Sequence, residues 1–376
     1  MLVHWIWFAH RPGLNDRDKM ALLQHFRDPE DIYFADDGAF DAIGLSEEAK
    51  TALREKNLTS AEEILEACDR EKLHILTCQD AAYPARLKNI ADPPVVLYYK
   101  GRLPDFDGSP VIGVVGTRKA SAYGLTTAKR MGYQIARCGG IVVSGMAYGI
   151  DGMAMSGALT AGAPAVGVLG CGADIVYPIS NRALFRDTEE YGCILSEFAP
   201  GTPPAKWTFP KRNRIISGLS CGVLVVEAPQ RSGALLTASH ALEQGKEVFA
   251  VPSDIYDPNA AGTLGLIRDG AIPAINVLDV AYPYFSHFAA QIRTQDLLVE
   301  KQAPFRKKKP LQHTSETKRS TRAADDSYDG YYDDVLPSDM DRQKEGLDKE
   351  LIKKVAVIAG GVLLIAGLCV LALYIL

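Results

Sequence analysis

Near-continuous apolar runs recur through the middle of the chain. A strand that is covered on both faces has this unbroken apolar character, and stretches of helical composition about ten residues long separate the runs. The pattern therefore predicts an α/β fold with a parallel, doubly wound sheet over residues 76–285. The predicted strands are Val111–Val115, Gly140–Ser144, Ala165–Leu169, Cys193–Ser196, Val223–Val226 and Val248–Val251.

Residues 1–75 instead have the pattern of short helices, predicted at Asn15–Phe26, Ser46–Glu55 and Ser60–Glu71. The last two begin with a serine followed by acidic residues, as helix starts do. The turns Pro12–Leu14 and Ile43–Leu45 resemble those of helix-hairpin-helix modules, which hold a DNA phosphate at a helix N-terminus. Compact helical bundles use similar turns, and packing is the favoured interpretation. We expect a small all-helical domain of the helix-hairpin-helix or SAM-like type.

The composition changes again after residue 285. A basic cluster that begins at Arg306–Lys309 is followed by seven aspartates between residues 325 and 341, with little apolar material. Such a segment cannot bury enough apolar surface to fold, so residues 286–354 are predicted to be a disordered charged linker.

Residues 355–376 contain neither a charge nor a proline. A helix of this length spans about 33 Å, enough to cross the apolar core of a bilayer. Lys349, Lys353 and Lys354 precede it, and positive flanks stay on the cytoplasmic side. The sequence predicts one transmembrane helix, a single-pass tail anchor in the cell membrane with the globular part in the cytoplasm.

Overall composition adds two limits. The net charge of −5 excludes a generally basic nucleic-acid coat protein, although a local basic groove remains compatible with it. The seven cysteines include no C-x-x-C pair, so neither a zinc site nor a disulfide framework is expected. We expect most cysteines to be small buried hydrophobic residues, and no metal.

Candidate binding residues lie in glycine-rich loops after the predicted strands, where open parallel sheets bind their ligands. The loop Gly116–Lys119 supplies Arg118, whose guanidinium fits a phosphate, and a second small loop begins at Ser144 and Gly145. A third loop, Phe209–Gly218, combines three cations with an aromatic ring, as a single nucleic-acid strand requires. A surface ion-pair patch with Phe209 in the core is the equal alternative. A fourth loop contains Ser232 and Gly233.

Together these segments resemble the DNA-processing protein A family (DprA, also called Smf). The matching motifs extend over about residues 76–275 in the family's order. They are the run from Tyr83-Pro84 to Gly101, Val115-Gly116-Thr117-Arg118, Ser144–Asp151, Tyr177-Pro178, Ser196-Glu197, Phe209–Ile216 and Ser232–Ala238. The resemblance implies a Rossmann-like, often dimeric domain without established catalysis. It implies binding of single-stranded DNA and loading of the RecA recombinase in natural transformation and recombination.

Carried over by motif, the resemblance implies a DNA groove without catalytic residues or cofactor. Its cations would be Arg118, Lys211, Arg212 and Arg214, with Phe209 as a stacking partner. The backbone amides of Gly145 and Gly233 would cradle phosphates. The other residues of the implied groove are Gly116, Thr117, Lys119, Ser144, Asn213 and Ser232.

The chain departs from the family at several positions. Tyr148 stands where the family usually has an arginine, which puts one cation of the groove in doubt. Met155 replaces a histidine, Ser253 a glycine, and Leu264 lies near a usual asparagine. The winged-helix domain often found at the family's C-terminus does not follow; the linker and the apolar segment do.

Two other functions compete with this interpretation. Phosphoribohydrolases of the LOG type resemble this fold but place a glutamate in a glycine motif, and the corresponding residues 230–238 contain no carboxylate. Asp151 and Glu227, the nearest acids, are expected to cap glycine loops. His240 has no paired nucleophile in the sequence. A membrane-tethered nucleotide sensor stays open, although a mononucleotide seldom needs three cations beside an aromatic ring.

Overall fold

The computed structural model describes residues 1–293, all of which belong to a compact unit formed by Met1–Lys308. The predicted transmembrane helix (355–376) and most of the predicted linker lie outside the described residues. Within residues 1–293, no helix has both the length and the apolar character that crossing a membrane requires.

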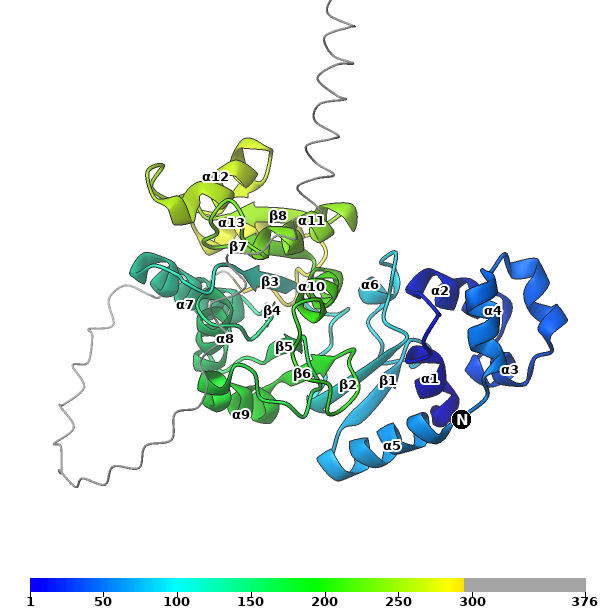
Figure 1. Cartoon of the computed structure of the whole chain (residues 1–376). Helices are drawn as coiled ribbons and strands as arrows, with labels where there is room; N and C mark the ends of the chain where they lie inside the picture. The colour runs from blue at the N-terminus through cyan, green and yellow to red at the C-terminus, as the bar shows by residue number, and fades with distance from the viewer. Residues whose placement is uncertain (294–376) are drawn as a thin grey trace, which may run out of the picture. The chain divides into compact units, whose positions relative to one another are not determined.

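A nine-stranded sheet forms the centre of this unit, in the order β1-β2-β6-β5-β4-β3-β7-β8-β9 (Figure 1). Neighbours from β6 to β9 are parallel, and the predicted strands are confirmed to within one residue. Three strands are additional: the antiparallel pair β1 and β2, at the edge beside β6, and the short parallel strand β9 beside β8. The strands are β1 (His74–Thr77), β2 (Val96–Gly101), β3 (Val111–Val115), β4 (Ile141–Ser144), β5 (Ala165–Leu169), β6 (Cys193–Ser196), β7 (Gly222–Val225), β8 (Glu247–Ala250) and β9 (Ile272–Pro273).

Helices cover both faces of the sheet because the chain reverses its direction of winding. Right-handed crossovers from β3 to β6 place α7 (Ala122–Arg137), α8 (Ile150–Thr160) and α9 (Arg182–Tyr191) on one face. The chain then returns past β3 to β7 and β8, so α10 (Thr208–Leu219) and α11 (Ala234–Glu243) pack together on the other face (Figure 1). The reversal lies between β3 and β7, which makes this pair the topological switch point.

The N-terminal region is helical, and its three predicted helices are confirmed. It contains α1 (Leu2–Ala9), α2 (Asp16–His25), α3 (Pro29–Phe34), η1 (Asp37–Ile43), α4 (Glu47–Arg54) and α5 (Thr59–Glu71). Gly13 and Gly44 turn the chain before α2 and α4 with φ of 86° and 70°. Acidic residues occupy the first turn of both helices, including Asp16 and Glu47, and they oppose a phosphate there. This arrangement supports the packing interpretation of the two turns.

Polar contacts join the helical region to the sheet. His10, at the end of α1, shares a hydrogen bond of 2.7 Å between its Nε2 and the Tyr98 hydroxyl on β2. The buried Lys19 donates from its Nζ to the Ala9 carbonyl over 2.6 Å. Asp16 lies beside two cations of α10, Lys211 and Arg214. The helical region is therefore attached to the sheet through buried polar groups as well as through apolar packing.

Stability should decrease in acid because of His10. Burial, together with the charges of Lys19 and Lys211, lowers its pKa from 6.5 to about 4. Between these values the unfolded chain binds the proton and the folded chain does not. The stabilising contribution is therefore complete above pH 6.5 and is lost as the pH falls toward 4, by about 3 kcal/mol.

The measurement is urea unfolding at several pH values between 7 and 4, on the wild type and on His10→Gln, whose side chain does not titrate. The free energy of unfolding should fall more steeply in the wild type. Equal slopes for the two proteins would contradict the assignment to His10.

The folded unit continues past residue 285, where the sequence analysis places the start of the linker. Phe288 packs on the hydrophobic core, Ile292 is buried, and the Arg293 amide donates to the Cys138 carbonyl over 2.9 Å. Two apolar side chains four residues apart are enough to hold this segment against the end of α7. The elements not yet named are α6 (Ala85–Lys88), η2 (Ile179–Asn181), η3 (Pro258–Ala260), α12 (Ala261–Arg268), α13 (Val277–Ala281) and η4 (Tyr282–Tyr284).

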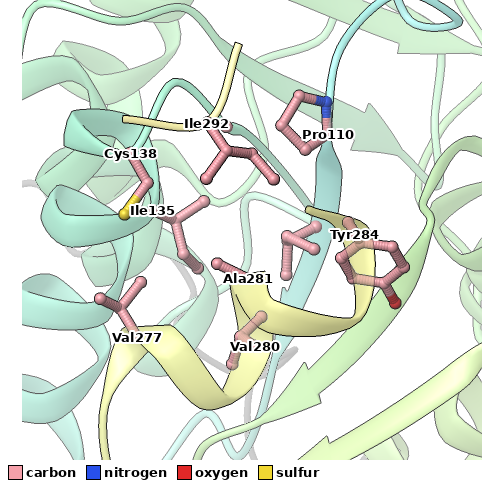
Figure 2. A pocket seen from close by; sticks show the side chains of 10 residues that line it. Pro110, Ile135, Cys138, Val277, Val280, Ala281, Tyr284 and Ile292 are labelled. Carbon is pink, nitrogen blue, oxygen red and sulfur yellow. The ribbon is translucent and has the colours of Figure 1, made fainter. Parts of the chain in front are cut away.

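Figure 2 shows a small apolar cavity between this C-terminal segment, the end of α7 and the start of β3. Ile135, Cys138, Val280 and Ile292 are among the residues that line it. Its volume of about 20 Å³ is close to the space of one water molecule. Because the lining is almost entirely apolar, a water molecule there would lack hydrogen-bond partners, so we regard the cavity as a packing gap.

The prediction that most cysteines are buried is confirmed for those in the described residues. The six in the described residues are free thiols, and five of them are buried. Burial raises the pKa of the Cys68 and Cys78 thiols to about 11 and that of Cys171 to about 12. These thiols remain protonated at neutral pH and are poor nucleophiles.

Candidate nucleic-acid interface

The loops after β3 and β7 lie side by side at the carboxyl edge of the sheet. The Thr117 amide donates to the Glu227 carbonyl over 2.7 Å, and the Val226 amide donates to Val115. Parallel sheets bind ligands at this position because adjacent loops diverge from the switch point. The candidate site therefore lies here, at the end of β3 opposite to the apolar cavity.

Close packing explains the glycines of the loop after β4. Gly149 has a φ of 71°, and a Cβ there would lie 2.4 Å from the Thr117 carbonyl oxygen. A Cβ at Gly145 would lie 2.5 Å from the guanidinium nitrogens of Arg212. Both positions therefore require glycine for packing within the protein, before any ligand is considered.

Asp151, in the first turn of α8, holds two of these loops together. Its Oδ2 accepts from the Gly145 amide over 3.1 Å, and its carboxylate also accepts from Gly116. Burial raises the pKa of Asp151, while the positive charges of Arg212 and Arg118 oppose that shift. The expected capping role is confirmed. It also means that the Gly145 amide, predicted as a phosphate cradle, is occupied by this carboxylate.

Glu227 has a comparable role after β7. The side chain is buried, and its two carboxylate oxygens accept from the amide of Ser121 over 3.1 and 3.3 Å. Ser121 is in turn the N-cap of α7. Glu227 therefore fixes the loop after β3, which contains Arg118, against the loop after β7. The expected capping role of Glu227 is confirmed too.

The Phe209–Gly218 segment is not a loop, as the sequence analysis assumed, but lies within α10. Apolar residues at helical spacing, Ile215, Ile216 and Leu219, are buried and fix this helix against the sheet. Successive side chains of a helix point about 100° apart. The four polar residues 211–214 therefore point in different directions instead of forming one basic patch.

Arg212 points into the protein and is 4% exposed. Its Nη1 donates to the Gly145 carbonyl over 2.8 Å and also to the Val168 carbonyl. One guanidinium thus links the ends of β4 and β5 to α10. Arg212 therefore supports the carboxyl ends of these strands from inside the protein.

Arg214 and Lys211 face the helical region. Arg214 is 3% exposed, and its guanidinium lies 2.7 Å from Glu197, 2.8 Å from Asp92 and 3.5 Å from Asp16. Burial lowers the pKa of Arg214, but the three carboxylates outweigh it and raise the pKa. Lys211 Nζ lies 3.6 Å from Glu197 and 3.8 Å from Asp16. The sequence around Arg214 does not indicate Asp16 or Asp92 as its partners, because both are distant from it in the chain.

Phe209 and Arg118, both assigned to the implied groove, are in contact with each other. The Arg118 guanidinium carbon lies 5.2 Å from the centre of the Phe209 ring, a cation–π distance. The Tyr177 ring lies 5.7 Å from that of Phe209 at an angle of 36°. The ends of β3 and β5 and the start of α10 therefore contribute to one cluster of a cation and two rings.

Three other predicted residues are structural in this conformation. Ser144 is fully buried and donates to the Val114 carbonyl. Thr117 is buried, and its hydroxyl accepts from the Lys119 amide over 3.2 Å. The Gly116 Cα is packed against Ile150, so a Cβ at position 116 would clash with the Ile150 side chain. These residues shape the loops rather than reach solvent.

The remaining predicted residues lie at the surface or near it. Lys119 and Gly233 are exposed, and a Cβ at Gly233 would meet nothing within 4 Å. Asn213 donates from Nδ2 to the Gly233 carbonyl over 3.4 Å, and Ser232 Oγ accepts from the Ala234 amide. The start of α11 is therefore open to a ligand and tied to α10.

His240 lies on α11, with Nδ1 3.5 Å from the exposed Glu243 carboxylate, and has the expected surface role. Within residues 1–293, no group of three His, Cys, Asp or Glu side chains is arranged to hold a metal ion.

A doubly wound, mostly parallel sheet with helices on both faces places the protein in the class of Rossmann-like α/β proteins. Residues 74–284 match the sequence model of the family described as DNA recombination-mediator protein A, and the chain belongs to that family. The resemblance that the motifs indicate is thereby confirmed.

Individual relatives agree with this assignment. The chain is 43% identical to the DNA processing protein DprA of Bacillus subtilis over 208 residues, which cover 55% of this chain and 70% of the relative. The solved structure of DprA from Streptococcus pneumoniae matches with a TM-score of 0.66 and 32% identity, over 75% of this chain and 98% of that one. DNA processing protein A from Helicobacter pylori, whose structure is described as showing a unique single-stranded DNA binding mode, matches with a TM-score of 0.52 and 26% identity, over 58% of this chain and 98% of that one.

Proposed function

We propose that this protein binds single-stranded DNA along the carboxyl edge of its sheet and acts without catalysis. The observation that carries the proposal is the cluster of Arg118 on Phe209 at the switch point, next to the open start of α11. A guanidinium neutralises a phosphate, and helix N-termini favour anions. The Helicobacter relative, described as binding single-stranded DNA, supports the choice of ligand.

The thirteen predicted site residues then divide into three groups by their exposure and their contacts. Arg118, Lys119, Lys211, Ser232 and Gly233 are partly or fully exposed and are proposed to face the DNA. Phe209, partly buried, shapes the surface beneath Arg118. The others position these groups through packing and hydrogen bonds: Gly116 and Asn213 are partly buried, and the buried ones are Thr117, Ser144, Gly145, Arg212 and Arg214.

The test is equilibrium binding of the full chain to a fluorescent single-stranded oligonucleotide and to its duplex, across a salt series. We expect preferential binding of the single strand, with an affinity that decreases as salt rises because counterions are released. Equal affinity for duplex and single strand would refute the proposal. Competition by mononucleotides at stoichiometric concentrations would instead favour the nucleotide sensor or the phosphoribohydrolase.

We also propose that the protein acts in recombination and natural transformation. A bound strand presented by two copies of the chain would be a substrate on which RecA could assemble. The proposal requires a homodimer and a contact with RecA. Analytical ultracentrifugation tests the first, and RecA filament formation on coated DNA tests the second. A monomer that leaves RecA assembly unchanged would refute both the homodimer and the contact with RecA.

We also propose that residues 355–376 attach the protein to the cell membrane, with its globular part in the cytoplasm. The support is the uncharged apolar composition of this segment and the three lysines that precede it. Fractionation of cells that express the chain with and without residues 355–376 tests the attachment. Recovery of both forms in the soluble fraction would contradict it.

A further inference from the structure

The Phe209 ring is already engaged within the protein. Arg118 lies over it at 5.2 Å, and Tyr177 packs against it at 5.7 Å. Gly170 adds to this packing, since a Cβ there would come within 2.8 Å of the ring. A nucleobase needs an open ring face to stack on. Phe209 therefore serves as the support of Arg118 better than as the platform for a base.

Trp207, two residues earlier, offers such a face. It is 62% exposed at the start of α10, although an indole is among the side chains that gain most from burial. Its ring rests edge-on against Phe198, with centroids 5.6 Å apart and an angle of 78°. Phe198 is itself buried and lies two residues after the end of β6. The indole is therefore held by a fixed support while most of its surface faces solvent.

The segment that carries Trp207 is also restrained. The Asp174 carboxylate accepts from the Gly201 amide over 3.0 and 3.1 Å. The Thr208 hydroxyl donates to the Ala205 carbonyl over 2.8 Å, and two prolines at 203 and 204 limit the backbone between them. Little conformational entropy is then lost when a ligand stacks on the indole.

The position of Trp207 continues the proposed DNA path. The Arg118 cluster lies at the ends of β3 and β5, and Phe198 places the indole at the end of β6, the next strand along the same edge (Figure 1). Lys206 precedes it in the chain. Exposed rings alternating with cations are what a single strand requires, since each base has a face and each phosphate a charge.

We propose that Trp207 is a base-stacking platform that extends the single-stranded DNA site from the switch point to the end of β6. The inference rests on the proposed function and adds to it a particular residue, a ligand group and a direction along the sheet. The ligand group is an unpaired nucleobase of any sequence, because stacking does not read hydrogen-bonding edges.

Intrinsic fluorescence tests the contact in the unmodified chain. Of the three tryptophans, Trp5 and Trp7 are 9% and 4% exposed in the helical region, so Trp207 is the one open to a stacking base. Titration with an oligothymidylate should quench the emission, and the quenching should be absent in Trp207→Phe. Binding without any change in emission would overturn the inference.

Affinity gives the second measurement. Trp207→Ala should weaken binding of the oligothymidylate by about 5- to 100-fold, the range for one stacked base. An oligonucleotide with abasic sites should bind the wild type more weakly, and Trp207→Ala should weaken it no further. Tyr191→Ala is the matched control, because Tyr191 is 64% exposed but lies at the end of α9 just before β6 begins. That variant should bind like the wild type.

The outcomes separate this inference from the proposed function. If the wild type binds the single strand and Trp207→Ala binds it equally well, the platform is refuted and the function stands. If the wild type does not bind single-stranded DNA, the function itself is refuted. If Trp207→Ala unfolds, Trp207→Phe and the wild-type quenching still decide the question.

Discussion

Replacing Arg118 with alanine should lower the affinity for single-stranded DNA by about 10- to 100-fold, the usual effect of losing a charge-assisted contact with a phosphate. The slope of log affinity against log salt should fall by about 0.7, since one phosphate fewer is neutralised on a single strand. The guanidinium is partly exposed and stacks on Phe209. Fluorescence anisotropy with a labelled oligonucleotide at several salt concentrations measures both quantities.

Two further variants sharpen this result. Arg118→Lys keeps the charge but loses the flat guanidinium that fits the ring, so its affinity should fall between those of the wild type and Arg118→Ala. Arg186→Ala removes the same charge from α9, where the side chain is 75% exposed beside Asp187. If Arg186→Ala weakened binding as much as Arg118→Ala, the effect would be general electrostatics, and the site would lie elsewhere.

Replacing Arg214 with alanine should destabilise the fold by about 3–5 kcal/mol, the usual cost of removing one partner from a buried ion pair. The guanidinium is 3% exposed, and its loss would leave Glu197, which is 12% exposed, and Asp16 with the more exposed Lys211 as their shared counter-ion. The free energy of unfolding from urea denaturation measures the effect, and the denaturation midpoint should fall. The control is Arg268→Ala, whose side chain is 81% exposed beside Asp269 and should change stability by about 0.5 kcal/mol or less.

The Arg214→Ala variant shows whether Arg214 in α10 stabilises the fold or contacts the DNA directly. If Arg214 acts as a structural group, Arg214→Ala loses stability, and the protein that remains folded keeps its affinity for DNA. A variant as stable as the wild type but deficient in binding would assign Arg214 to direct contact instead. A partial rescue by Glu197→Gln in the Arg214→Ala background would locate the lost energy in their ion pair.

The fold was largely predictable from local pattern. Strands such as β3, β4 and β5 are buried on both faces, so they form near-continuous apolar runs that are easily recognised in the sequence. The antiparallel strands β1 and β2 were not identified from pattern. They lie at the sheet edge, where β2 ends in the half-exposed and exposed residues Lys100 and Gly101, and their short runs resemble loop sequence.

The candidate site was predictable only in part. The glycine loops and Arg118 could be found because open α/β sheets place ligands after their strands. The Phe209–Gly218 segment was predicted as a loop, since its basic residues conceal the apolar face of a helix. Whether each of its cations points to solvent or to the interior depends on its angle around α10, which composition does not reveal.

The sequence by itself determined the class of fold, the order of the elements and the family, because these follow from hydrophobic period and from motifs of neighbouring residues. Tertiary structure alone decided the roles of the charged residues. Arg212 is structural because it donates to the carbonyls of Gly145, just after β4, and Val168, in β5. Arg214 is structural because it pairs with Asp16, which lies far away in the chain. Burial and ion pairing depend on such distant partners, and local sequence contains no record of them.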